Sequence, residues 1–200
     1  MNVQAGWAAC HDSGEMRRHA ILALTATGLA ALAAGCGGNS SPDTKSTADQ
    51  SSGRFPAAGI TFTPPADWST QPGTGPLVAT VQAGEATVAV WRYPRTQRLP
   101  KTEAELQAAR DALLKASAAR DTGFARIKTA ATKIAGLPAV QIRARQTMSG
   151  QPRTVRSTHI YAHGAEIVID AYADADNFRR IDAQVFRPLL RSLQVTRPAA

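Results

Sequence analysis

Cysteine is scarce in this sequence, with only Cys10 and Cys36 among 200 residues, and both precede the part that we expect to fold. A disulfide framework and a cysteine-ligated metal site are therefore excluded for the folded domain. Aromatic residues make up 6% of the chain, but 44% of the residues are hydrophobic, which is enough for the core of one domain. An exported domain of this kind must be held together by its core alone.

Long hydrophobic runs and catalytic motifs are also absent. The most apolar stretch, residues 20–34, has 15 residues, whereas a transmembrane helix needs about 20. The chain contains no phosphate-binding loop, no dinucleotide-binding glycine motif and no Gly-x-Ser-x-Gly nucleophile motif. We therefore expect no enzymatic activity, no catalytic residue and no cofactor. The alternative is an enzyme with an undetected site, which two or more strongly shifted titratable groups in a cleft would indicate.

The N-terminal residues have the three parts of a secretory signal. Arg17 and Arg18 form a short basic segment, an apolar run follows, and small residues lead to Cys36. This pattern predicts a signal peptide over residues 1–35. Acidic residues are unusual in such a basic segment, and two of them precede Met16, so Met16 is an alternative start of the protein.

The end of the apolar run, LAAGC at Leu32–Cys36, resembles the lipobox of bacterial lipoproteins. The usual pattern has leucine three residues before the cysteine, where this chain has Ala33. The resemblance implies that Cys36 becomes the lipidated N-terminus, which would anchor the protein to the outer, extracytoplasmic face of the cell membrane. The alternative is an ordinary cleaved signal with a coincidental cysteine.

Residues 36–54 are predicted to be the lipidated cysteine and a flexible linker. Gly, Ser, Thr, Asn, Asp and Pro dominate residues 37–53, which contain no apolar side chain larger than alanine. Such a segment cannot bury enough surface to offset its ordering entropy, and it would span about 20–25 Å. The globular domain is predicted over residues 55–197.

The domain alternates between strand and helix patterns. Period-2 runs predict strands over residues 60–63, 77–82, 86–93, 129–136, 139–148, 154–162 and 165–173. A capping box at Thr102 and Glu105 predicts a helix start, and a second helix is expected from about Asp176. Pro188 predicts a break in it around residues 185–187. The fold class is therefore α+β, with an antiparallel sheet of about six to seven strands and helices packed on both faces.

Three segments resemble a known family. They are GITFTPPADW at residues 59–68, AGLPAVQI at residues 135–142 and FRPLLRSLQV at residues 186–195. Their order resembles that of the PsbP-like fold, and within it that of the LpqN-type bacterial lipoproteins. The resemblance supplies no catalytic residues. It implies a non-catalytic binding or accessory role in the cell envelope, with an unknown envelope protein or wall component as partner.

Basic residues are the most informative surface feature, because the net charge is +8. Arg143, Arg145 and Arg156 are expected on one strand face, with Arg156 opposite Arg145 if the turn is at residues 150–151. Such a cluster would contact anionic headgroups or an acidic partner. The alternative is ordinary solubility charge that protects a strand from edge pairing. Nucleic acid is not expected as a partner, since export removes access to it.

Other candidate sites have simpler interpretations. His159 and His163 lie on a strand and its turn, about 13 Å apart, which is too far for one metal ion. Asp170, Asp174 and Asp176 lack calcium-loop spacing, so no metal is expected. Trp68 and Trp91 are expected to pack in the core. If they lined one pocket, the alternative function would be a carrier of a small apolar ligand between sheet and helices.

Overall fold

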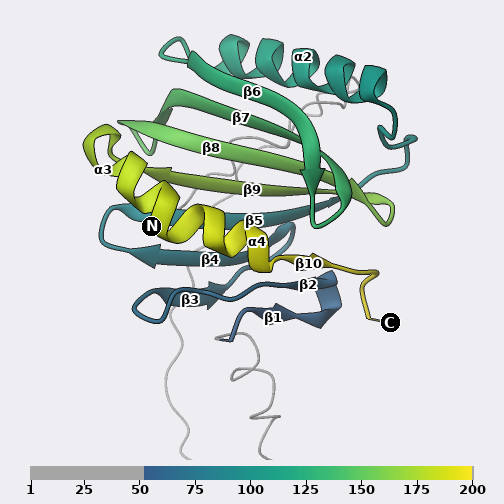
Figure 1. Cartoon of the computed structure of the whole chain (residues 1–200), viewed down its shortest axis with the longest axis horizontal. Coiled ribbons are helices and arrows are strands. Elements are labelled where there is room, and N and C mark those ends of the chain that lie inside the picture. Colours follow the sequence, from purple (N-terminus) through teal and green to yellow (C-terminus); the bar gives the residue numbers. More distant parts are fainter. Residues whose placement is uncertain (1–51, 200) are drawn as a thin grey trace, which may run out of the picture.

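A computed structural model describes residues 52–199 of the chain, so the predicted signal peptide and Cys36 lie outside the described residues. The centre is a seven-stranded sheet in the order β3-β4-β5-β9-β8-β7-β6, with every neighbouring pair antiparallel (Figure 1). Its strands are β3 (Ser69–Pro72), β4 (Leu77–Ala83), β5 (Ala86–Pro94), β6 (Ala125–Ile134), β7 (Leu137–Met148), β8 (Gln151–Ala162) and β9 (Ala165–Ala173).

Two-residue turns fix the register of the long strands. The turns Ala135–Gly136, Ser149–Gly150 and His163–Gly164 have positive φ at both residues, from +49° to +77°. Turns with two left-handed residues match the right-handed twist of the strands that they join. The β7–β8 turn therefore lies at residues 149–150, one residue before the expected position, and this difference changes which arginines face each other.

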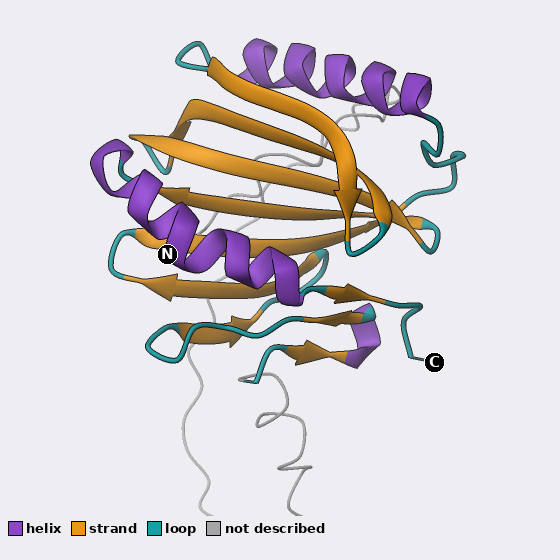
Figure 2. Ribbon diagram, in the orientation of Figure 1, coloured by secondary structure: helices purple, strands orange, loops and turns teal. Residues whose placement is uncertain are grey.

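A small second sheet brings the two ends of the described chain together. It contains β1 (Arg54–Phe55), β2 (Ile60–Thr61) and β10 (Gln194–Val195), with the 3-10 helix η1 (Pro56–Ala58) between β1 and β2. The backbone N–H of Thr63 also donates to Ser192 Oγ at 2.9 Å. The chain thus enters the domain beside the segment that ends it (Figure 2).

Helix α2 (Glu103–Arg120) covers β6 and β7 on one face of the sheet and begins with the predicted capping box. Thr102 Oγ1 accepts from the Glu105 N–H at 3.2 Å, and the Glu105 carboxylate accepts from the N–H groups of Thr102 and Lys101. These backbone hydrogen bonds lower the pKa of Glu105 to about 2. The predicted start of this helix is confirmed.

The C-terminal helix covers the opposite face without the predicted break. It runs through α3 (Ala175–Ile181), the π-helical turn η2 (Asp182–Phe186) and α4 (Arg187–Ser192). Pro188 has no N–H to donate, and the chain accommodates it with a wider turn in which the Arg187 N–H bonds to the Asp182 carbonyl. The N-cap position belongs to Asp174, not Asp176, and the Asp174 side chain binds Arg153 instead of capping.

The core has two sides, because neighbouring strand residues point to opposite faces. Ile160, Ile167 and Ile169 pack with Phe186 under the C-terminal helix. Val140 and Ile142 pack under α2 with residues such as Leu106 and Tyr161. The prediction of an α+β fold with helices on both faces of an antiparallel sheet is confirmed.

The capping box makes a first stability prediction. Thr102→Ala should lower the free energy of unfolding by about 1 kcal/mol, because the Glu105 N–H loses its side-chain acceptor. Urea unfolding followed by circular dichroism measures this. Thr122→Ala, in the exposed loop after α2, is the control and should change stability by less than about 0.5 kcal/mol. Equal losses in the two variants would contradict the cap.

Candidate functional site

An open cleft lies between the β6–β7 hairpin, the middle of β7 and β8, and α4. Its volume is about 310 Å³, and its lining residues are Lys133, Ile134, Ala135, Gln141, Arg156, Arg187, Leu190 and Arg191. Four of these described residues carry a positive charge and none carries a negative one. The cleft is therefore a basic site, and we call it the basic cleft.

A buried carboxylate holds the innermost cation of the basic cleft in place. Asp182, which is 5% exposed, accepts from Arg156 Nε at 2.6 Å and from Arg156 Nη2 at 2.8 Å. The remaining nitrogen, Nη1, donates to Gln141 Oε1 at 3.4 Å, and Gln141 Nε2 donates to Thr158 Oγ1 at 3.1 Å. A two-point contact of this kind fixes the guanidinium plane.

The π-helical turn adds a second arginine to the same carboxylate. Residues five apart in a regular α-helix lie about 140° apart around the axis. The wider turn brings Arg187 back towards Asp182, so that Arg187 Nε lies 3.4 Å from Asp182 Oδ2. Lys133 and Arg191 have no ion pair within the described part of the chain. Four cations and one carboxylate leave three positive charges at the basic cleft.

The three arginines of the predicted cluster share one strand face, but the cross-strand partner of Arg156 differs from the expected one. Arg143 and Arg156 are direct cross-strand partners, while Arg145 faces Thr154, so the expected pairing of Arg156 with Arg145 is wrong. The turn at residues 149–150 causes this shift. Arg156 lines the basic cleft, and half-buried Arg143 is its neighbour on β7. Exposed Arg145 lies two residues further along the same strand face.

A row of like charges crosses this face of the sheet. Arg143 pairs in register with Lys128 on β6 and with Arg156 on β8. Arg143 Nε is buried and has no hydrogen-bond partner among the described residues. Like charges directly opposite each other destabilise a sheet, and Asp182 offsets this only for Arg156. The row is therefore poorly explained by stability alone.

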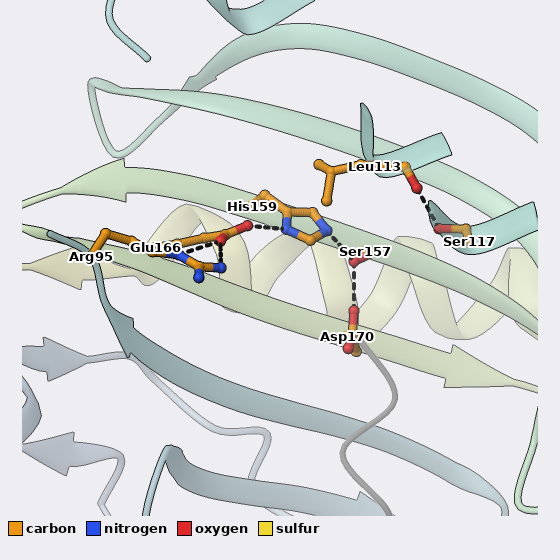
Figure 3. Close-up of polar contacts among 7 residues, drawn as sticks. All are labelled: Arg95, Leu113, Ser117, Ser157, His159, Glu166 and Asp170. Atoms are coloured by element: carbon orange, nitrogen blue, oxygen red, sulfur yellow. Dashed lines mark hydrogen bonds and ion pairs between the residues drawn. The ribbon is translucent and has the colours of Figure 1, made fainter. Parts of the chain in front are cut away.

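The opposite sheet face holds a buried polar cluster that we did not predict, shown in Figure 3. Ser157 Oγ donates to Asp170 Oδ1 at 2.6 Å and lies 3.0 Å from His159 Nε2. His159 Nδ1 lies 2.7 Å from Glu166 Oε1, and Arg95 Nε donates to Glu166 Oε2 at 3.0 Å. We call these five residues the buried network.

Charge and burial act differently on the two carboxylates of the buried network. Burial tends to raise the pKa of Glu166, but the hydrogen bonds and charges of His159 and Arg95 outweigh it and lower the pKa to about 2. Burial raises the pKa of Asp170, and the Ser157 hydrogen bond and the His159 charge oppose this less strongly. Asp170 thus lies at one end of the hydrogen-bonded chain, and Glu166, whose pKa shifts the other way, lies between His159 and Arg95.

Two proton arrangements satisfy the contacts within the buried network. With Asp170 ionised, Ser157 donates to it and accepts from a doubly protonated His159. With Asp170 protonated, Asp170 donates to Ser157, and Ser157 donates to His159 Nε2. Each arrangement leaves the charges of Arg95, His159, Glu166 and Asp170 balanced. This balance lets His159, Glu166 and Asp170 be buried beside the partly exposed Arg95.

The buried network has the connectivity of a serine nucleophile with its base, but a substrate cannot reach the Ser157 hydroxyl in this structure. Ser157 and His159 are each 0% exposed. Leu113 of α2 packs over the adjoining apolar cluster, and Ser117 of α2, which is 3% exposed, donates to the Leu113 carbonyl at 2.7 Å (Figure 3). A nucleophile must reach a substrate atom. In this structure the network is placed to hold strands together.

Simple counting along the β8–β9 hairpin could have found the buried network. With the turn at His163–Gly164, Ser157 lies opposite Asp170, and His159 and Glu166 fall on the same face. The sequence signal for the buried network, which we missed, is a set of polar residues that share one face of two neighbouring strands. The basic cleft had no such signal, because Lys133 and Arg191 come from distant segments.

The histidines and aspartates that the sequence analysis considered as metal ligands do not come together in the structure. His159 is in the buried network, whereas His163 is in a turn. Asp170 contacts Ser157, and Asp174 contacts Arg153. Among residues 52–199, no group of three or more His, Cys, Asp and Glu side chains is arranged to hold a metal ion. No helix within those residues has the length and apolar character to cross a membrane.

Comparison with known proteins identifies the fold. No protein-family model matches the chain, and no curated protein matches its sequence. The solution structure of cyanobacterial PsbP (CyanoP) from Synechocystis sp. PCC 6803 matches with a TM-score of 0.53 at 16% identity, covering 82% of this chain and 98% of that one. LpqN of Mycobacterium tuberculosis, described as involved in cell envelope biogenesis, matches with a TM-score of 0.49 at 18% identity, covering 68% and 83%. The chain has the PsbP-like fold, as its sequence predicts.

Proposed function

We propose that this protein is a lipid-anchored protein of the extracytoplasmic face of the cell membrane that binds a partner in the cell envelope without catalysis. The basic cleft is the observation that carries the proposal. Its described lining offers cations, one amide and apolar groups, but no serine, cysteine, histidine or carboxylate. Ser157 and His159, which have the connectivity of a nucleophile with its base, are buried on the opposite face. The accessible chemistry is therefore binding of negative charge.

The position of the chain's entry supports an anchor near the basic cleft. Strand β1 pairs with β2, and β2 pairs with β10, which directly follows α4. The linker would thus reach the domain beside the helix that contributes Arg187 and Arg191. A flexible linker of that length spans about 20–25 Å, which allows the basic cleft to face the membrane or a partner close to it.

The two tryptophans that were considered for an apolar carrier lie on different faces of the sheet. Trp68 packs against Phe186 on the face of the C-terminal helix, with ring centroids 6.3 Å apart. Trp91 stacks on Tyr93 on the other face, at 6.2 Å. The two tryptophans cannot line one cavity, because the sheet lies between them.

Lipid attachment at Cys36 is tested in a bacterium that acylates exported lipoproteins. Wild-type protein should label with radioactive palmitate and sediment with membranes, because acyl chains hold it there. Cys36→Ala should lose the label and most of the membrane association. Cys10→Ala is the matched control and should behave like the wild type. Palmitate labelling that survives Cys36→Ala would contradict the anchor.

The binding role is tested by crosslinking in native membranes. Wild-type protein should give a specific crosslinked species that Cys36→Ala does not give, since only the anchored form is held next to its partner. Failure to recover any partner or wall component with the anchored wild type would contradict the binding role and leave the anchor intact.

A further inference from the structure

We propose that the basic cleft binds an organic phosphate: a phosphate group carried on a small aliphatic or polyol moiety, such as a phosphoglycerol. This inference rests on the proposed binding function and names its ligand class. Its source would be either the headgroup of an anionic membrane lipid or a soluble phosphate ester. Both sources present negatively charged phosphate oxygens to the same side chains, from a phosphodiester in the lipid and from a monoester in the soluble compound.

The excess positive charge of the basic cleft favours an anionic ligand. Lys133 and Arg191 are exposed, and neither has an ion pair within the described part of the chain. Arg156 and Arg187 share the single carboxylate of Asp182. A bound phosphate monoester carries up to two negative charges and a phosphodiester carries one, so either would neutralise part of the remaining excess.

Arg156, the least exposed cation of the basic cleft, is held in one orientation before any ligand binds. Asp182 fixes the Arg156 guanidinium through Nε and Nη2, and Nη1 has only a long contact, 3.4 Å, to Gln141. A donor held in one orientation loses little conformational entropy when an oxyanion binds. Arg156 therefore resembles a fixed donor, while Lys133, Arg187 and Arg191 are exposed cations of the same lining. Arginine and lysine together are the usual phosphate ligands.

The remaining lining limits the size and character of the ligand. Ile134, Ala135 and Leu190 form an apolar wall beside the cations. A volume of about 310 Å³ is at the lower end of small-molecule sites, so it suits a headgroup or a small ester and not a whole lipid. The apolar wall would contact the carbon atoms that bear the phosphate, which distinguishes this site from one for inorganic phosphate.

The test uses the full-length chain with Cys36→Ala, so that the acyl anchor does not itself bind vesicles. Calorimetry measures binding of sn-glycerol 3-phosphate. Sedimentation measures binding to phosphatidylcholine vesicles with or without phosphatidylglycerol. The variant Lys133→Gln/Arg191→Gln removes two exposed cations of the basic cleft. The matched control, Lys101→Gln/Lys115→Gln, removes two exposed cations near or on α2, on the other face.

We expect the Lys133→Gln/Arg191→Gln variant to bind the phosphate probes at least about tenfold more weakly than the parent. Each charge-assisted hydrogen bond contributes more binding free energy than a neutral hydrogen bond does. The control should stay within about twofold. If the Lys133→Gln/Arg191→Gln variant loses binding of glycerol phosphate, the site is one for a soluble ester. If this variant loses only the binding to phosphatidylglycerol vesicles, the site is one for a lipid headgroup.

Two outcomes would overturn the proposal. If the control weakens binding as much as the cleft variant, the attraction is a property of the overall positive charge and not of this site. If the parent protein binds neither probe, the basic cleft does not recognise organic phosphate. Neither result would affect palmitate labelling at Cys36 or crosslinking to an envelope partner, so the proposed function would be judged separately.

Discussion

Asp182→Ala should lower the free energy of unfolding by about 3–5 kcal/mol, because it leaves Arg156 charged and nearly buried without a counter-ion. The Arg156 side chain is 15% exposed and that of Asp182 is 7% exposed. Both hydrogen bonds that the guanidinium donates to Asp182 are lost in this variant, and only the 3.4 Å contact with Gln141 remains. Urea unfolding at neutral pH, followed by circular dichroism, measures the change.

An exposed ion pair provides the comparison for this effect. Asp111 pairs with Arg110 at 2.8 Å, but the Asp111 side chain is 65% exposed. Asp111→Ala should therefore cost less than about 1 kcal/mol. The double variant Arg156→Met/Asp182→Leu should regain most of the lost stability, since it removes both charges together. A small loss in Asp182→Ala, similar to that in Asp111→Ala, would show that Arg156 finds water or another acceptor.

Glu166→Gln is expected to have the second largest effect, a loss of about 3 kcal/mol at pH 7. His159 and Arg95 overcome the cost of burial and hold the pKa of Glu166 at about 2, compared with 4.5 for a free side chain. Glutamine keeps the shape of the side chain but cannot carry the charge that His159 and Arg95 bind.

The pH dependence of this loss identifies its origin. A depressed carboxyl pKa contributes stability that is fully present above the unfolded-state pKa and is lost as pH falls through the folded-state pKa. The difference in stability between wild type and Glu166→Gln should therefore be constant above about pH 5 and shrink between about pH 4.5 and pH 2. Urea unfolding at several pH values gives this difference directly.

A carboxylate outside the buried network is the control for the pH series. Glu103 is exposed in the first turn of α2, and Glu103→Gln should show a nearly constant and small difference from wild type. If Glu166→Gln showed the same loss at pH 2 as at pH 7, the loss would come from altered packing and not from the Glu166 charge.

Local signals in the sequence predicted much of the fold. Thr102 and Glu105 are close in the chain, so their capping box is visible without any tertiary information. The β4–β5 hairpin and the strands β7, β8 and β9 follow from alternating patterns between glycine-containing turns. Where the exact turn residues were misjudged, at Ser149–Gly150, the partner of Arg156 was misjudged as well.

The C-terminal helix shows the limit of local reasoning. Pro188 correctly indicated an irregularity, because proline always removes a backbone donor. Whether the chain breaks there or widens into a π-helical turn depends on what the helix packs against. Phe186 and Leu189 are each 1% exposed in the core, and a continuous helix keeps both of them there. The energy of burying these side chains exceeds the cost of one irregular turn.

By itself, the sequence determined the fold class of the domain, the helix cap and the strand pattern, because these depend on neighbouring residues and on periodicity. The PsbP-like fold was implied by the resemblance of three segments to that family. The sequence also predicted the signal and the lipid attachment at Cys36, which lie outside the described residues. Only the tertiary structure decided that Arg156 is held by Asp182 and joined by Lys133, Arg187 and Arg191 in one cleft. Those residues come from four separate elements, and charges so distant in the chain meet only when the packing of a helix on a sheet brings them together.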